Sequence, residues 1–210
     1  MICKVELPAS AAEVASWRVG DVLTLSGVVL TARDLAHRRI LEASLQEACL
    51  REASPQDAGE RGLDLPFDPT GLPIFHCGPL ARRDGVRWTI AGLGPTTSAR
   101  MESTTPAIMA RFATPFLIGK GGMGPATRAA LVERGAAYLA AVGGTGALGA
   151  RAVAEVLSVA WLEELGMPDA VWVLRLSEYG PLVVTMDSRG RDLHEEIVRA
   201  AERTLGNASR

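Results

Sequence analysis

The chain has 210 residues, of which 48% are hydrophobic and 22% charged, so it can bury a substantial core and fits one large domain or two small ones. Its formal net charge is -2 and its basic residues are scattered, which argues against a nucleic-acid-binding protein. No apolar run approaches the roughly 18 residues of a membrane span, and a secretion signal is not recognisable, so we expect a cytoplasmic protein. Three cysteines, Cys3, Cys49 and Cys77, lie too far apart to suggest a disulfide framework or a metal cluster.

The first part of the chain predicts one long strand, one helix and a loop. Residues 21–32 are rich in β-branched side chains and predict a strand or a bent strand pair. In residues 34–52 apolar side chains recur at three- and four-residue steps, which predicts a helix whose start Thr31 or Asp34 can cap. Residues 54–71 contain Pro and Gly throughout, so we expect a mobile surface loop and a candidate lid.

The rest of the chain alternates between short strands and helices. Strands are predicted at 73–78, 86–91, 116–119, 136–143, 153–162, 171–179 and 181–188. Helices are predicted at 105–112, 125–135 and 191–205. There is no internal repeat and no low-complexity segment, so we expect a single α/β domain over residues 1–210, with a mixed sheet and helices packed on it.

The segment GTGALG has the G-x-G-x-x-G spacing of dinucleotide-binding loops at Gly144, Gly146 and Gly149. It follows an apolar strand, and acidic residues lie about 20 positions further on, as a dinucleotide site requires. However, the helix that would follow is too short for an ordinary crossover, and close packing also selects glycine and alanine. Dinucleotide binding through these glycines therefore remains an alternative function.

The segment GKGGMG at 119–124 presents Lys120 on a turn, at the expected carboxyl end of a strand and with helix-start amides nearby. Such amides and an ammonium group both attract anions. Two departures argue against a phosphate-binding P-loop: Lys120 is followed by glycine instead of a Ser or Thr that could bind magnesium, and the leading glycine of the motif is absent. The alternative is a solvated lysine beside glycines that only turn the chain.

Two further turns, GPTTSARM at 94–101 and TARDLAH at 31–37, each contain an arginine. In the first, Arg100 follows three consecutive hydroxyl side chains, and a guanidinium group with hydroxyl donors suits a dicarboxylate. In the second, Arg33 stands at a strand end and His37 one helical turn later. Capping, turn formation or a helix-start ion pair are the alternatives. No segment combines a nucleophile with its base, so these turns are typical of half an active site, completed by another chain.

Five motifs in this order, SGVVLTARDLAH, IFHCGP, GPTTSARM, FLIGKGGM and YLAAVGG, resemble the β subunit of iron–sulfur-dependent (class I) fumarate hydratase and L(+)-tartrate dehydratase, the equivalent of the C-terminal domain of single-chain class I fumarases. The resemblance covers roughly residues 20–190. It departs from the family at Ala99, where glycine is usual, and at AVGGTGAL, where the family has AVGGAAAL. The second departure indicates that the GTGALG spacing arose by chance.

The resemblance implies a swivelling β/β/α domain paired with an α subunit whose three cysteines hold a [4Fe-4S] cluster. It implies a hydro-lyase that dehydrates malate to fumarate or tartrate to oxaloacetate, in a hetero-oligomer of doubled αβ pairs without nucleic acid or membrane. Arg33, Arg100 and Lys120 look like the cations that bind the substrate carboxylates. Thr96 looks like the group that takes or returns the carbon-bound proton.

Asp34, His37 and Thr97 are weaker candidates, as partners that orient the substrate-binding cations, with Asp34 and His37 expected beside Arg33. No metal ligand is expected on this chain. Besides the hydro-lyase subunit, a stand-alone dicarboxylate-binding or regulatory module without catalysis remains an alternative from another functional class.

Overall fold

The computed structural model describes residues 2–53 and 65–208, of which 45–53 and 206–208 are described by their backbone only. The strands are β1 (Ile2–Glu6), β2 (Val22–Thr31), β3 (Ile74–Phe75), β4 (Leu80–Asp84), β5 (Arg87–Gly92), β6 (Phe116–Gly119), β7 (Ala137–Ala141), β8 (Val153–Ala160) and β9 (Val171–Met186). The helices are α1 (Ala11–Ser16), α2 (Asp34–Ala53), α3 (Thr105–Phe112), α4 (Pro125–Arg134), α5 (Gly146–Arg151), α6 (Leu162–Leu165) and α7 (Leu193–Ala208), with a 3-10 turn η1 (Ser98–Met101).

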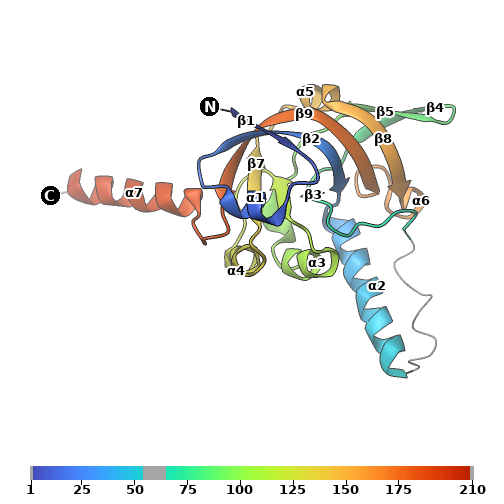
Figure 1. Cartoon of the computed structure of the whole chain (residues 1–210), viewed down its shortest axis with the longest axis horizontal. Helices are drawn as coiled ribbons and strands as arrows, with labels where there is room; N and C mark the ends of the chain where they lie inside the picture. Colours follow the sequence, from blue (N-terminus) through green and yellow to red (C-terminus); the bar gives the residue numbers. More distant parts are fainter. Residues whose placement is uncertain (1, 54–64, 209–210) are drawn as a thin grey trace.

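Seven of the described strands form one sheet in the order β1-β2-β3-β6-β7-β9-β8, and β9 also pairs with β2. This extra pairing closes β2, β3, β6, β7 and β9 into a ring, around which β9 curves in Figure 1. In the ring, β2, β3, β6 and β7 are parallel to one another, whereas β9 is antiparallel to both β2 and β7. The predicted α/β fold with a mixed sheet is confirmed, and four strands end at the same edge.

The two faces of the ring strands contribute to different apolar clusters. In β3, Phe75 belongs to the first cluster and Ile74 to the second, as expected from the alternation of side chains along a strand. The first cluster draws on all five ring strands and fills the ring. The second is covered by α2, α3 and α4, through Ile40, Ile108 and Leu131. Burial of these apolar side chains between the helices and the sheet stabilises the packing of α2, α3 and α4 on the sheet.

Several predicted elements differ from the observed ones. The predicted strands 171–179 and 181–188 are one strand, β9, which bends where Glu178 has a positive φ. The predicted strand 73–78 is observed only as the two-residue strand β3, and Cys77 forms an isolated bridge with Pro95 of a different segment. β1, α1, β4 and α6 were not predicted.

The predicted mobile loop 54–71 is described only in part, because residues 54–64 lie outside the described residues. In the described part, Leu65 and Phe67 pack against the second apolar cluster. This end of the segment is therefore attached to the core. None of the described helices combines the length and the apolar character that a membrane crossing needs.

The glycines of GTGALG allow α5 to pack closely on the chain that follows β5. The amide of Leu93 donates a 2.8 Å hydrogen bond to the carbonyl of Gly146, and a Cβ on Gly149 would overlap the Leu93 carbonyl oxygen. A Cβ on Gly92 would instead make an ordinary contact with Leu80 at 3.4 Å. The α5 glycines thus have a packing role.

We expect Gly149→Ala to lower the free energy of unfolding by about 1–3 kcal/mol, because the added methyl group forces α5 away from the Leu93 backbone. Urea denaturation followed by circular dichroism measures this change. Gly92→Ala is the matched control and should change stability by less than about 0.5 kcal/mol. Equal stability of the Gly149 variant and the wild type would show that α5 does not pack as tightly as described.

Candidate functional site

The carboxyl ends of the parallel strands carry the cations that the sequence singled out. Arg33 and Asp34 follow β2, and Lys120 directly follows β6. Because β2, β3 and β6 are neighbours and parallel, these residues lie at the same edge of the sheet. Open parallel sheets and closed barrels of parallel strands both generally place their ligand sites at this edge.

The GPTTSARM segment is inserted between the ends of β3 and β6. The amide of Thr96 donates to the carbonyl of His76 at 2.7 Å, and the amide of Lys120 donates to the carbonyl of Thr96 at 3.3 Å. The amide of Ser98 then donates to the carbonyl of Lys120 at 3.2 Å, so that Thr97 and Lys120 form a parallel bridge. The structure therefore brings Thr96, Thr97 and Lys120 together through the backbone.

Arg33 is held by a carboxylate that the sequence analysis did not identify. Its Nε and Nη2 donate to the two oxygens of Asp169 at 3.0 and 3.1 Å, and Asp169 Oδ1 also accepts from the amide of Leu35 at 3.3 Å. The hydrogen bond to Asp169 raises the pKa of Arg33, although partial burial opposes the shift. Asp169 thereby ties the loop before β9 to the start of α2 and fixes the Arg33 fork.

Asp34 pairs with Arg100 and not with Arg33. The Arg100 Nη2 donates to Asp34 Oδ2 at 2.6 Å, which joins the start of α2 to η1. The prediction that Asp34 orients an arginine thus applies to the other candidate arginine. Both arginines are already bound to a carboxylate of the chain, which fixes their position and reduces their mutual repulsion.

Lys120 differs from the two arginines in its surroundings. It is half-buried, and among the described residues no Asp or Glu forms an ion pair with its ammonium group. The side chain lies over the turn after β7, since a Cβ on Gly143 would be 3.5 Å from Lys120 Cδ and 3.9 Å from Nζ. Lys120 therefore carries a positive charge that an external anion can neutralise.

Two buried histidines support this edge from below. His37 Nδ1 lies 2.9 Å from Thr104 Oγ1, His76 Nδ1 lies 2.8 Å from Ser98 Oγ, and the ring centroids are 5.3 Å apart. The Tyr138 hydroxyl also donates to Ser98 at 2.9 Å. Burial lowers the pKa of His37 to about 4 and that of His76 well below its ordinary value, so both are neutral near pH 7. The His37 ring therefore supports Thr104, whereas the contact of His37 with Arg33 is a backbone hydrogen bond, from the His37 amide to the Arg33 carbonyl at 2.8 Å.

The helix-start amides near Lys120 are occupied by Glu102. Its carboxylate accepts from the amides of Gly124, Ala126 and Thr127 at 2.7, 2.9 and 3.0 Å, and from the Thr127 hydroxyl at 2.6 Å. These amides are not available to an external anion, contrary to the expectation from the sequence. Glu102 instead attaches the chain after Arg100 to α4, as an internal cap.

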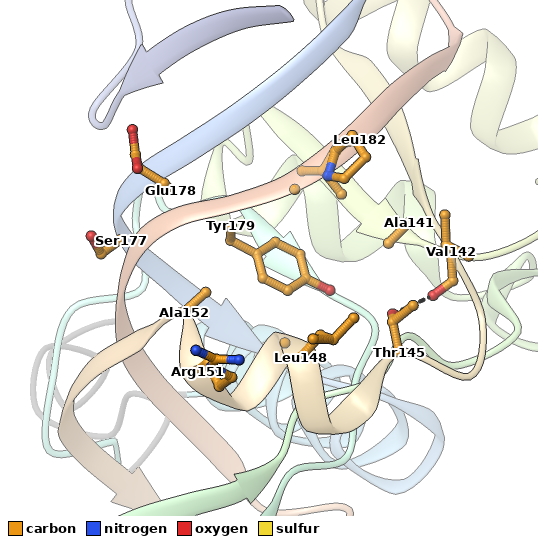
Figure 2. A pocket seen from close by; sticks show the side chains of 13 residues that line it. Ala141, Val142, Thr145, Leu148, Arg151, Ala152, Ser177, Glu178, Tyr179 and Leu182 are labelled. Carbon is orange, nitrogen blue, oxygen red and sulfur yellow. Dashed lines mark hydrogen bonds between the residues drawn. The ribbon is translucent and has the colours of Figure 1, made fainter.

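A cavity of about 380 Å³ lies between α5 and the middle of β9 (Figure 2). Leu148 and Arg151 of α5 face Tyr179 and Leu182 of β9 across it. No candidate cation lines this cavity. The strands on either side of α5, β7 and β8, both pair with β9 and not with each other, so GTGALG is not part of the parallel strand–helix–strand unit of a dinucleotide site.

Among residues 2–44 and 65–205, no group of three His, Cys, Asp or Glu side chains is arranged to hold a metal ion. Cys77 is buried, which raises the pKa of its thiol to about 12, and Cys3 is exposed on β1. The side chain of Cys49 lies outside the described residues. The described residues therefore do not fit an iron–sulfur cluster.

The family model for the fumarase C-terminus matches residues 2–197. The chain belongs to this fumarase C-terminus family. The L(+)-tartrate dehydratase subunit beta of Escherichia coli (strain K12) is 36% identical over 189 residues, which cover 90% of this chain and 85% of the relative. The putative L(+)-tartrate dehydratase subunit beta of Methanocaldococcus jannaschii is 38% identical over 185 residues, covering 88% and 87%.

A putative fumarate hydratase class I of Geobacillus stearothermophilus is 34% identical over 201 residues, which cover 95% of this chain and 35% of the relative. The family resemblance inferred from the five motifs is thus confirmed. In this fumarase C-terminus family member, the motif residues Arg33, Thr96, Arg100 and Lys120 lie at one edge of the sheet. Asp169 and Glu102, which fix two of these turns, were missed because neither lies in a motif that suggests a site.

We expect Glu102→Gln to destabilise this fumarase C-terminus family member by about 1–2 kcal/mol near pH 7, because the charged cap of α4 is lost. Burial alone would raise the pKa of Glu102, but the hydrogen bonds from Thr127, Gly124 and Ala126 together lower it from its ordinary value of 4.5. A lowered folded-state pKa stabilises the fold above the unfolded-state pKa, and this contribution disappears as the pH falls through the folded-state pKa. The difference between variant and wild type should therefore shrink below about pH 4.5.

Urea denaturation at about pH 7 and about pH 3.5 measures this difference. Glu133→Gln, the same chemical change at an exposed position of α4, is the control and should have little effect at either pH. A destabilisation by Glu102→Gln that is independent of pH would contradict the charged cap.

Proposed function

We propose that this chain is the substrate-binding β subunit of a cytoplasmic [4Fe-4S]-dependent hydro-lyase that reversibly dehydrates a 2-hydroxy dicarboxylic acid, malate to fumarate or tartrate to oxaloacetate. The observation that carries the proposal is the position of Thr96 and three cations at the same edge of the sheet, where the parallel strands end, in a fumarase C-terminus family member. The printed names of the relatives, tartrate dehydratase subunit beta and fumarate hydratase class I, support the reaction type.

The three cations can share the binding of a dianionic substrate. Lys120 supplies an ammonium group that is not paired with a carboxylate in the described part of the chain. Arg33 uses Nε and Nη2 for Asp169, and Arg100 uses Nη2 for Asp34, so each guanidinium keeps further N–H donors. Each charge-assisted hydrogen bond to a carboxylate contributes about 1.5–3 kcal/mol, so two or three such contacts suffice to hold a small dicarboxylate.

Thr96 is the proposed group that takes or returns the carbon-bound proton. An ordinary hydroxyl is a weak base, and nearby positive charge favours its deprotonated form. Thr96 is hydrogen-bonded to Lys120 through the backbone and lies four residues before Arg100, so both cations belong to its surroundings. Asp34, His37 and Thr97 have supporting roles: Asp34 holds Arg100, His37 supports Thr104, and Thr97 bridges to Lys120.

The proposal assigns the [4Fe-4S] cluster to an α subunit, since the described residues of this chain do not fit one. The word "subunit" in the names of two relatives supports a partner of this kind. A hetero-oligomer of doubled αβ pairs is the arrangement that the family resemblance implies. In this arrangement the present chain binds and orients the substrate carboxylates at the face that the α subunit covers.

Anaerobic co-production with a cluster-carrying α subunit should give an enzyme that converts malate or tartrate, and Lys120→Met should lower its kcat/KM by about 100-fold. The loss corresponds to about 3 kcal/mol of transition-state binding, because methionine keeps the length of the side chain but removes the charge. Absorbance of the unsaturated or oxo product measures turnover of each acid.

Arg82→Met is the matched control, since it removes an exposed cation from the β4–β5 hairpin and should leave kcat/KM unchanged. Unchanged kinetics of Lys120→Met would remove Lys120 from the site. Full turnover by the isolated, demonstrably metal-free chain would overturn the proposed function. Micromolar binding of malate or tartrate to the isolated chain, with no turnover in the assembled pair, would favour the stand-alone binding module.

Thr96→Val should lower kcat by at least about 100-fold with little change in KM, because the cations that bind the carboxylates remain while the hydroxyl is lost. Thr96→Ser keeps the hydroxyl and should retain most of the activity. Steady-state kinetics of both variants in the assembled enzyme makes this comparison. A valine variant with wild-type kcat would exclude Thr96 as the proton-transferring group.

A further inference from the structure

Helix α7 separates apolar and charged side chains onto opposite faces. At about 100° per residue, its apolar face spans an arc of about 160°. This apolar face consists of Leu193, Ile197, Val198, Ala200 and Ala201. The opposite face carries Glu195, Glu196, Arg199, Glu202 and Arg203.

The apolar face of α7 is not covered by the described part of the chain. Figure 1 shows α7 projecting from the body beyond the sheet and the other helices. Ile197 is 58% exposed and Val198 is 55% exposed, and Ala200 and Ala201 are exposed as well. An amphipathic helix gains most of its stability by burying such a face, so this helix is suited to a partner.

The charges of α7 favour a protein partner over a membrane surface. Helices that lie on membranes carry a polar face rich in Lys and Arg. The charged face of α7 has three acidic and two basic residues, which gives a net charge of 2 − 3 = −1. Three of these five charges are also paired within the chain. Glu196 binds Arg191, and Glu195 binds both Arg199 and Arg128.

The apolar face of α7 continues the surface of the candidate site. His194 falls within the same arc of the helix, and its Nδ1 would lie 3.4 Å from a Cβ on Gly122, two residues after Lys120. Arg128 of α4 binds Glu195 at 2.8 Å and fixes the start of α7 beside this loop. A partner that covers Lys120 and Gly122 therefore meets the apolar face of α7 as the next part of the same surface.

We propose that the apolar face of α7 is a docking surface for the cluster-carrying α subunit. This inference rests on the proposed function, which requires that subunit at the Lys120 loop. A specific interface buries about 800 Å² on each side, which is more than the exposed side chains of one four-turn helix supply. A second copy bound through α7 alone would fall short of this area, whereas the α subunit contacts α7 and the site face together. The family match ends at residue 197, so most of α7 lies beyond it.

Ile197→Glu tests the docking surface with separately purified chains. We expect the variant to bind the α subunit at least tenfold more weakly than the wild type, because docking would bury the charge of the new glutamate in an apolar contact. Binding is measured by anaerobic titration of the α subunit. The exposed position and the good helix propensity of glutamate should leave the melting temperature and the helical circular dichroism unchanged.

Arg203→Glu is the matched control, because it introduces the same side chain on the opposite face of α7 and should change the affinity less than twofold. Wild-type affinity of Ile197→Glu for the α subunit would overturn the inference. A wild-type chain that is dimeric alone, and monomeric as Ile197→Glu with unchanged α-subunit binding, would overturn it in favour of a second copy. If Ile197→Glu binds normally while Lys120→Met assembles and shows the expected loss of kcat/KM, the docking inference fails and the proposed function stands.

Discussion

The arrangement of the site depends on the insertion of residues 95–98 between the ends of β3 and β6. Three backbone hydrogen bonds from Thr96, Ser98 and Lys120 replace the pairing that the two strands would otherwise continue. This insertion requires a glycine at position 119, because a Cβ there would overlap Ser98 Oγ and lie 2.9 Å from the Tyr138 hydroxyl. The first glycine of GKGGMG therefore admits another segment of the protein and does not cradle a phosphate.

Gly121 and Gly124 of the same segment are favoured as glycine for two other physical reasons. Gly121 has a φ of +71°, which glycine adopts without strain, so it turns the chain after Lys120. A Cβ on Gly124 would collide with the carboxylate of Glu102 that caps α4. Gly119 thus leaves room for the inserted segment, Gly121 turns the chain, and Gly124 leaves room for the carboxylate that caps α4. Gly119, Gly121 and Gly124 have the G-x-G-x-x-G spacing of nucleotide-binding loops. Here this spacing arises from three unrelated steric requirements, which is why the pattern alone is a weak signal of function.

The sequence predicts the features that are local along the chain. The periodicity of residues 21–32 and 34–52 predicts β2 and α2, and the polar turns predict where cations collect. It does not predict the closure of the ring, because the pairing of β2 with β9 joins residues about 150 positions apart and no local pattern encodes it. Asp169 was missed for the same reason: it lies 136 residues after Arg33.

The three candidate cations of the site differ in whether a carboxylate of the chain binds them. Asp169 binds Arg33 and Asp34 binds Arg100. Each carboxylate weakens the attraction of its arginine for an anionic ligand, but it also fixes the guanidinium group before the ligand binds. The buried His37 and His76 are neutral near pH 7, so the layer below adds hydrogen bonds without further positive charge. Lys120 has no carboxylate partner among the described residues, and it stands on the loop that also lies against His194 of α7 at Gly122. A partner that packs on α7 would therefore lie beside the loop of the candidate cation that no carboxylate binds in the described part of the chain.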